Sequence, residues 1–124
     1  YVTNVKEGKQ YKVGRKTIPP HIPYSECDLP SSEFTACIAR GVDFSYADLS
    51  GSLFTNAFLE GANFEEADLR GVDFTGSNLT GANFRGAQLD DADFEIANLT
   101  GADFTGANTT DATFKGANIT DVKY

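Results

Sequence analysis

Residues that could carry out catalysis are scarce in this 124-residue chain. His21 is the only histidine and lies among prolines, so neither a Ser–His–Asp triad nor a histidine-based metal cluster can form. The glycine–lysine and glycine–arginine pairs at residues 8–9 and 14–15 do not follow the pattern of a phosphate-binding loop. The sequence therefore predicts a protein that is not an enzyme, with no catalytic residue, no cofactor and no metal ion.

The two cysteines allow either a redox role or simple packing. Cys27 and Cys37 lie ten residues apart. A disulfide between them would require Cα atoms within about 7 Å. The alternative is a pair of buried thiols that pack as small apolar side chains. Both alternatives are open from the sequence.

Aspartates recur at intervals of twenty residues, which would align their carboxylates if the chain coils with that period. Asp48 and Asp68 follow Asp28 at this spacing, and Asp93 follows Asp73. Such columns could hold Ca²⁺, which takes several oxygen ligands. The glycine-rich nonapeptide signature of calcium-binding β-rolls is absent, so the sequence favours solvated acidic columns.

The residues that must position these side chains repeat every five positions. Phenylalanine returns every tenth residue from Phe34 to Phe114, and leucine lies midway between successive phenylalanines from Leu49 to Leu99. Units this short cannot bury a core alone, so the pattern predicts a solenoid whose stacked coils share one core. The predicted core ladder consists of Phe34, Phe44, Phe54, Phe64, Phe74, Phe84, Phe94, Phe104, Phe114, Leu49, Leu59, Leu69, Leu79, Leu89 and Leu99.

Each five-residue unit predicts a very short strand followed by a turn. Two residues before the large apolar centre, most units carry alanine, and side chains two apart in an extended chain face the same way. The residue between them, mostly aspartate or asparagine, must then face outward. Two residues after the centre, ten units carry glycine, which accepts a positive φ at a corner.

Charged residues indicate how many units close one coil. Stacked strands lie about 4.8 Å apart, so equivalent positions in successive coils come together. At a separation of twenty residues, the position after the centre pairs opposite charges: Arg40 with Glu60, Glu65 with Arg85, Arg70 with Asp90, and Glu95 with Lys115. The pattern therefore predicts four units per coil and about five coils over residues 27–124.

Net charge narrows the range of partners. Residues 1–26 carry five basic and two acidic residues, and the whole chain has a net charge of −8, so residues 27–124 hold −11. An acidic body disfavours direct binding to nucleic acid. It suits solubility, a basic protein partner, or mimicry of a nucleic-acid surface. No apolar run is long enough to span a membrane.

The repeats resemble the pentapeptide-repeat family, whose motif is written A(D/N)LXX. Residues 67–71 (ADLRG), 97–101 (ANLTG) and 102–106 (ADFTG) match it, and the resemblance covers 41–124 closely and 27–40 loosely. It implies an all-β fold, a right-handed quadrilateral parallel β-helix, here preceded by an N-terminal cap or extension over residues 1–26. Members include proteins that modulate DNA gyrase by resembling DNA, cyanobacterial regulators, and thylakoid-lumen or periplasmic proteins without assigned roles.

From the repeats we expect a non-catalytic interaction or scaffold module, a rigid acidic rod with an unknown protein partner. The alternatives are a DNA-mimic modulator of an enzyme such as a type II topoisomerase, and a structural lumenal or periplasmic protein. The chain begins at Tyr1 and contains no methionine. We therefore expect that a signal, a transit peptide or a neighbouring domain has been removed. An exported compartment, the thylakoid lumen or the periplasm, is favoured over the cytoplasm.

Deviations from the repeat are the candidates for a partner surface. Ile38, Leu53 and Phe58 are apolar at outward positions, and Tyr46 occupies a corner, as Ile96 also does. Ile38 and Phe58 are twenty residues apart and should stack on one outer face. Either residues 1–26 cover them, or they contact a partner.

The last coil offers a different surface. It carries Phe114, Ile119 and Tyr124 with nothing after them to cover its edge. Open strand edges pair with other chains unless they are blunted. The sequence therefore predicts a longer natural chain that caps this coil, or an end-to-end homodimer through it.

Overall fold

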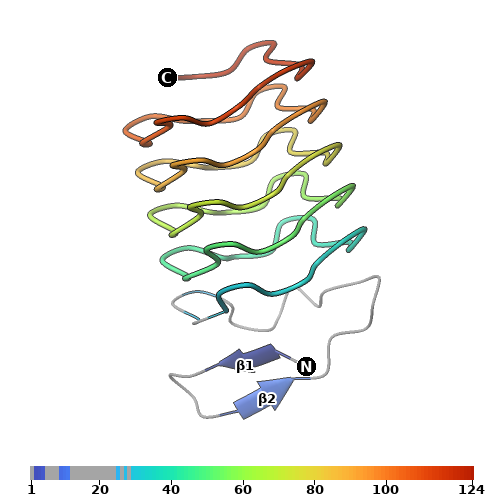
Figure 1. Ribbon diagram of the computed structural model, residues 1–124, viewed down its shortest axis with the longest axis vertical. Coiled ribbons are helices and arrows are strands. Elements are labelled where there is room, and N and C mark those ends of the chain that lie inside the picture. Colours follow the sequence, from blue (N-terminus) through green and yellow to red (C-terminus); the bar gives the residue numbers. More distant parts are fainter. Residues whose placement is uncertain (1, 5–8, 12–24, 26, 28) are drawn as a thin grey trace.

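The computed structural model describes residues 2–4, 9–11, 25, 27 and 29–124. Two short strands, β1 (Val2–Asn4) and β2 (Lys9–Tyr11), pair antiparallel, with Thr3 opposite Gln10. This hairpin lies beside the N-terminal end of a stack of coils (Figure 1). Most of the predicted cap, residues 1–26, falls outside the described residues, so its covering role stays a prediction.

The stack is a β-solenoid joined by isolated parallel bridges. Every bridge connects residues twenty positions apart, which is the separation that the charge pattern predicts. The bridged positions recur every five residues, so each coil has four sides. One side holds the column Glu33, Leu53, Asp73, Asp93 and Thr113.

Backbone hydrogen bonds run from each coil to both of its neighbours. In one unit, the Phe54 N–H donates to the Asp73 carbonyl at 2.7 Å, and the Asp73 N–H donates to the Ser52 carbonyl at 3.0 Å. Within the unit, the Ala57 N–H donates to the Phe54 carbonyl at 3.1 Å and closes the corner. A five-residue unit contains no complete set of partners of its own, so its backbone is satisfied only when coils stack.

Phenylalanine rings fill the interior as two interleaved columns. Phe54 and Phe74 stack in one column, with ring centroids 5.4 Å apart and planes 20° apart. Phe64, from the opposite column, meets the edge of Phe74 at 5.6 Å and 74°. Both arrangements are favoured geometries for aromatic pairs. The predicted core ladder is buried except for Phe114, which is partly buried.

Only one of the four predicted charge pairs forms directly among the described residues. Arg40 Nε lies 2.8 Å from Glu60 Oε2. Arg70 instead contacts Asp68, and Arg85 contacts Asp103. The period was identified correctly, but the pairing was wrong for the other three pairs. For the two arginines, the acceptors are the outward carboxylates of Asp68 and Asp103, which also accept the N–H of their own turns.

We predict that Phe74→Ala lowers the free energy of unfolding by about 3–5 kcal/mol, because the two ring columns cannot collapse around the missing side chain. Phe74 is fully buried between four other rings. Urea denaturation followed by circular dichroism measures the loss. Phe58→Ala is the matched control, since it removes the same ring from a site that is 41% exposed. Equal losses for the two variants would contradict the shared-core description.

Candidate interaction surface

The outward aspartates and asparagines have a structural task. Asp73 Oδ1 accepts a hydrogen bond from the Thr75 N–H at 2.8 Å, and Asn83 Oδ1 accepts one from the Arg85 N–H at 2.9 Å. The same bond recurs on every side of the solenoid. A short side-chain oxygen two residues before a turn N–H forms an Asx turn. These residues therefore define the corners rather than a binding site.

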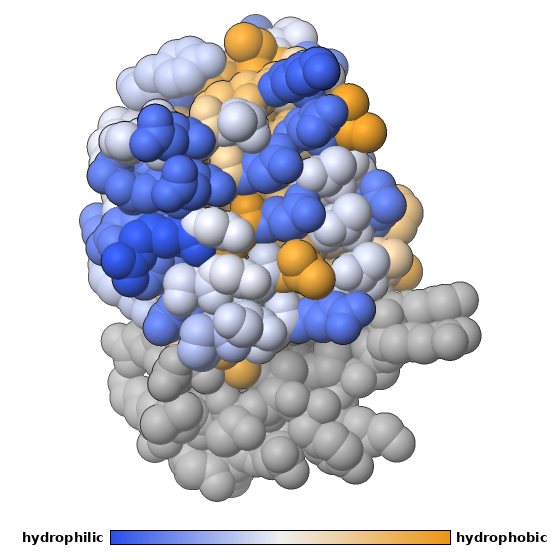
Figure 2. All heavy atoms as spheres, in the orientation of Figure 1, coloured by the Kyte–Doolittle hydropathy of each residue, from blue (hydrophilic) through white to orange (hydrophobic). Residues whose placement is uncertain are grey.

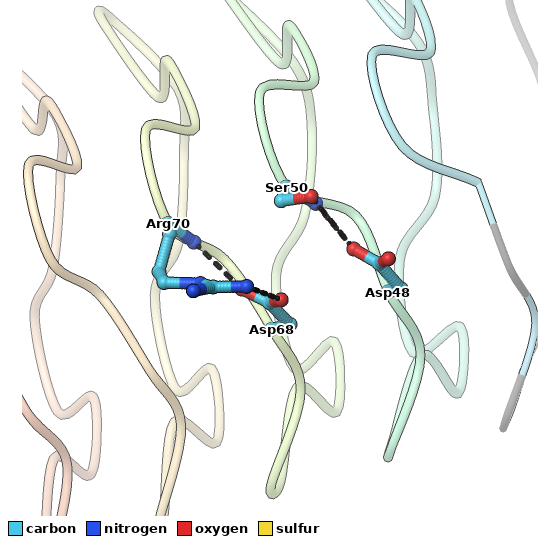
Figure 3. A network of polar contacts seen from close by, with 4 residues as sticks. All are labelled: Asp48, Ser50, Asp68 and Arg70. Atoms are coloured by element: carbon cyan, nitrogen blue, oxygen red, sulfur yellow. Dashed lines mark hydrogen bonds and ion pairs between the residues drawn. The ribbon is translucent and has the colours of Figure 1, made fainter.

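Two successive coils show the Asx turn with different partners (Figure 3). Asp48 Oδ1 accepts from the Ser50 N–H at 3.1 Å and from the Ser50 hydroxyl at 2.7 Å. At the equivalent place, Asp68 accepts from Arg70 Nε at 2.8 Å and Nη2 at 2.7 Å. The hydrogen bond from the Arg70 side chain is the main cause that lowers the pKa of the Asp68 carboxyl.

The acidic columns stack as predicted, with Asp48 bridged to Asp68 and Asp73 to Asp93. Asp28 falls outside the described residues. Within the part of the chain that the structure describes, no group of three histidine, cysteine, aspartate or glutamate residues is arranged to hold a metal ion. The same part contains no helix that could cross a membrane.

Cys27 and Cys37 are both buried thiols, so the candidate disulfide does not form in the structure. They lie half a coil apart, on opposite sides of a core occupied by phenylalanine rings. Desolvation by burial raises the pKa of the Cys37 thiol to about 12, against an opposing backbone hydrogen bond. At neutral pH this thiol is protonated and unreactive, since the thiolate is the nucleophile.

The candidate partner residues separate into two places. Ile38 and Phe58 form one parallel bridge, and Leu53 lies on the neighbouring side of the same coil as Phe58. Leu53 is 42% exposed and Phe58 41% exposed, while Ile38 is half-buried. Tyr46 sits at a corner half a coil away and does not join them. The structure therefore brings together three of the four residues.

Arg40 completes this surface, although sequence reasoning used it only to find the register. Its guanidinium carbon lies 5.2 Å from the centre of the Phe58 ring, a cation–π contact. Its Nε lies 2.8 Å from Glu60 Oε2, a charge contact that lacks hydrogen-bond geometry. The sequence signal for this arrangement is the position of Arg40, two residues after the outward Ile38. The outward aromatic residue Phe58 lies one coil after Ile38.

The corners explain where Tyr46 and Ile96 belong. Both have a positive φ, 59° and 52°, and both are exposed at sites that usually carry glycine. Where glycine occupies the same corner one coil later, the earlier side chain lies against that glycine, as Ile96 and Asn56 do. The Ile96 side chain would be 3.1 Å from a methyl group added at Gly116, and the Asn56 oxygen would meet one added at Gly76.

A second apolar surface lies on the last coil. Phe104, Thr109, Phe114, Ile119 and Tyr124 line a hollow of about 190 Å³. Ile119 is 51% exposed and Tyr124 is 83% exposed. Thr109 replaces the leucine expected in its column, which leaves part of this space unfilled.

Comparison with known proteins gives one family. Its sequence model, described as a pentapeptide repeat region, matches residues 21–84 and 47–124. A pentapeptide repeat protein from the thylakoid lumen of Arabidopsis thaliana is 36% identical over 77% of this chain and 63% of its own, with a TM-score of 0.63. The chain thus spans less than two thirds of that relative. No curated protein shows significant sequence similarity to the chain.

A second solved structure resembles the chain to the same degree. It is HetL from the cyanobacterium Nostoc sp. strain PCC 7120, a pentapeptide repeat protein involved in the regulation of heterocyst differentiation. HetL is 31% identical over 86% of this chain and 50% of its own length, with a TM-score of 0.63.

We predict that Gly81→Ala destabilises the protein by about 1–2 kcal/mol, because φ is +67° there. The added methyl group would meet no other atom, so the backbone conformation is the only cause of the loss. Gly76→Ala should cost more, since its φ is +68° and the methyl group must also displace Asn56. Urea denaturation measures both. In an Asn56→Gly background the two alanine variants should cost the same. A difference that persists there would show that Asn56 is not the cause.

We predict that Arg70→Ala raises the pKa of Asp68 toward the ordinary value of 3.8. The folded-state pKa is lowered, so the pair stabilises the fold above the unfolded pKa, and this contribution disappears as pH falls through the folded pKa. Carboxyl NMR shifts followed between pH 2 and 6, at roughly half-unit steps, measure the change. Arg85→Ala is the control, since Arg85 contacts Asp103. An Asp68 titration unaltered by Arg70→Ala would contradict the assignment.

Proposed function

The chain belongs to the pentapeptide-repeat family, and we propose that it acts as a non-catalytic protein-interaction or scaffold module. In this proposal, a rigid acidic rod of about five right-handed, four-sided coils presents its outer surface to a protein partner. The partner is a protein rather than nucleic acid, because the repeat region carries a net charge of −11 once the basic residues 1–26 are set apart.

One observation carries the proposal: among the bridged outward positions, apolar residues occur only between residues 38 and 58 of the solenoid. Ile38, Leu53 and Phe58 are the apolar residues at bridged outward positions. From residue 63 onward, every bridged outward position is polar or charged. On the face that Figure 2 shows, hydrophilic residues form columns, and hydrophobic residues appear both near the N-terminal end and toward the C-terminal end. A protein with a purely structural role would not need apolar residues at these outward positions.

The rigidity of the solenoid also supports a role as an interaction module. Because coil-to-coil backbone hydrogen bonds and ring stacking continue through the described repeats, neighbouring coils cannot move independently. Outward side chains are therefore held at fixed spacings. A preorganised surface loses little conformational entropy when it binds.

Two other functions remain candidates. The acidic surface supports a DNA-mimic modulator of a DNA-binding enzyme such as a type II topoisomerase. The second is a structural protein of a lumen or periplasm, and the lumenal location of the similar Arabidopsis protein supports that compartment. Self-association is a further part of the proposal, because Ile119 and Tyr124 expose an apolar hollow on the last coil. Tyr124→Asp should then abolish any dimer seen by light scattering.

The test of the proposed function is affinity capture combined with a supercoiling assay. The immobilised chain should retain a specific protein from an extract of the source organism. A rod of similar net charge, made by replacing Leu53 with aspartate and Phe58 with asparagine, should retain less of it. Gyrase supercoiling should proceed at an unchanged rate with the chain present. Inhibited supercoiling would favour the DNA mimic. Failure of both the wild-type chain and the variant to retain any specific protein would favour the structural role.

A further inference from the structure

At one corner of the second coil, two adjacent columns carry exposed apolar residues at their outward positions. Leu53 occupies a column with Glu33 and Asp73, and Phe58 occupies the next column with Ile38 and Asn78. The turn at residues 55–56 lies between them. We name Leu53, Phe58 and this turn the Leu53–Phe58 edge. Ile96, which is 62% exposed, occupies the corresponding corner two coils further along.

Leu53 and Phe58 occupy positions where other coils carry a residue that forms an Asx-turn hydrogen bond. In the next coil, Asp73 accepts the Thr75 N–H and Asn78 accepts the Thr80 N–H. Leucine and phenylalanine have no oxygen with which to form these Asx turns. They also leave two-fifths of their own surface in solvent. The chain therefore loses local stability at two adjacent positions and exposes apolar area in return, which is the pattern of a contact surface.

Charge around the edge identifies the complementary partner. Leu53 lies between two acidic residues, Glu33 and Asp73, in its own column. On the Phe58 side, Arg40 contacts the Phe58 ring, and Glu60 neutralises the Arg40 charge at 2.8 Å. A basic partner would meet the carboxylates of Glu33 and Asp73 on the Leu53 side, whereas an acidic partner would be repelled there.

Shape limits the partner to a flexible segment. Leu53 and Phe58 lie on neighbouring sides of a corner, so a flat rigid surface that lies against one side meets the other at an angle, whereas an extended segment can follow the corner. Strand addition is excluded locally, because the Leu53 N–H already donates to the Ser32 carbonyl at 2.9 Å and the Phe58 N–H to the Cys37 carbonyl at 2.8 Å. Ile96 lies two coils away, about 10 Å, a distance that about three residues of an extended segment cover.

We propose that the Leu53–Phe58 edge docks an extended basic segment of a protein partner. Apolar side chains of that segment contact Leu53 and Phe58, and its lysine or arginine side chains face Glu33 and Asp73. This inference rests on the proposed function as an interaction module and names the surface and the chemistry of its partner.

The test uses fluorescently labelled octapeptides and the intact chain, with binding followed by fluorescence anisotropy. The probe alternates lysine with leucine, and two control peptides alternate lysine with serine and glutamate with leucine. We expect saturable binding of the lysine–leucine peptide and at least tenfold weaker binding of either control. The double variant Leu53→Asp/Phe58→Asn restores the residue types of its own columns, so it should fold, and it should bind the probe at least tenfold more weakly.

Tyr46→Gly is the matched control on the opposite corner and should leave probe binding unchanged. Equal binding of the probe to wild type and to the double variant would overturn the proposal and indicate unspecific attraction to the acidic rod. A wild-type dimer that the double variant dissolves would assign the edge to a second copy instead. Stronger probe binding after removal of residues 1–24, with none to the intact chain, would assign it to that segment. Retention of a natural partner equally by wild type and double variant would overturn the docking edge and leave the proposed function standing.

Discussion

Parallel hydrogen bonding between residues twenty positions apart is the interaction on which the rest of this structure depends. Each coil donates to and accepts from both neighbouring coils: the Phe54 N–H donates to the Asp73 carbonyl of the next coil, and the Leu53 N–H donates to the Ser32 carbonyl of the previous one. This arrangement fixes which side chains point inward, and it brings the phenylalanines into register as two columns of stacked rings. It also fixes the corners, where the backbone must adopt a positive φ whether or not glycine is available. Among the described residues, nine that are not glycine accept that conformation, so the register is stronger than the local preference of those residues.

The core and its period could be predicted from the sequence, because both depend on residue size and spacing alone. A large apolar residue every five positions has one compact arrangement, and the buried ladder from Phe34 to Phe104 follows from it. The side-chain pairing could not be predicted in the same way. Arg70 was expected to meet Asp90, but Asp68 lies in the same unit and is already oriented by the turn, so the nearer carboxylate binds the arginine.

The candidate surface was predicted in part. Ile38 and Phe58 could be placed together because they are twenty residues apart, and Leu53 was identified by its apolar side chain at an outward position. Tyr46 was grouped with them although it lies half a coil away, since an unusual residue type says nothing about which side it occupies. Arg40 was recognised only as a charge. Its contact with the Phe58 ring depends on the direction that a long side chain takes, and the spacing of the repeat does not determine that direction.

The four-sided coil has a consequence for how such a chain can change its length. Inserting or deleting twenty residues adds or removes one complete coil, so every column beyond that point keeps its side and the core remains continuous. Inserting five residues keeps the large side chains inward, but it turns all later columns by one side and places later phenylalanines over leucine columns. A change of one residue exchanges inward and outward positions and destroys the core. Insertions or deletions of a multiple of fifteen nucleotides therefore keep the large side chains inward. Only multiples of sixty nucleotides also keep the surface pattern in place. Length and surface can thus vary in separate steps, the first by whole coils and the second by single units.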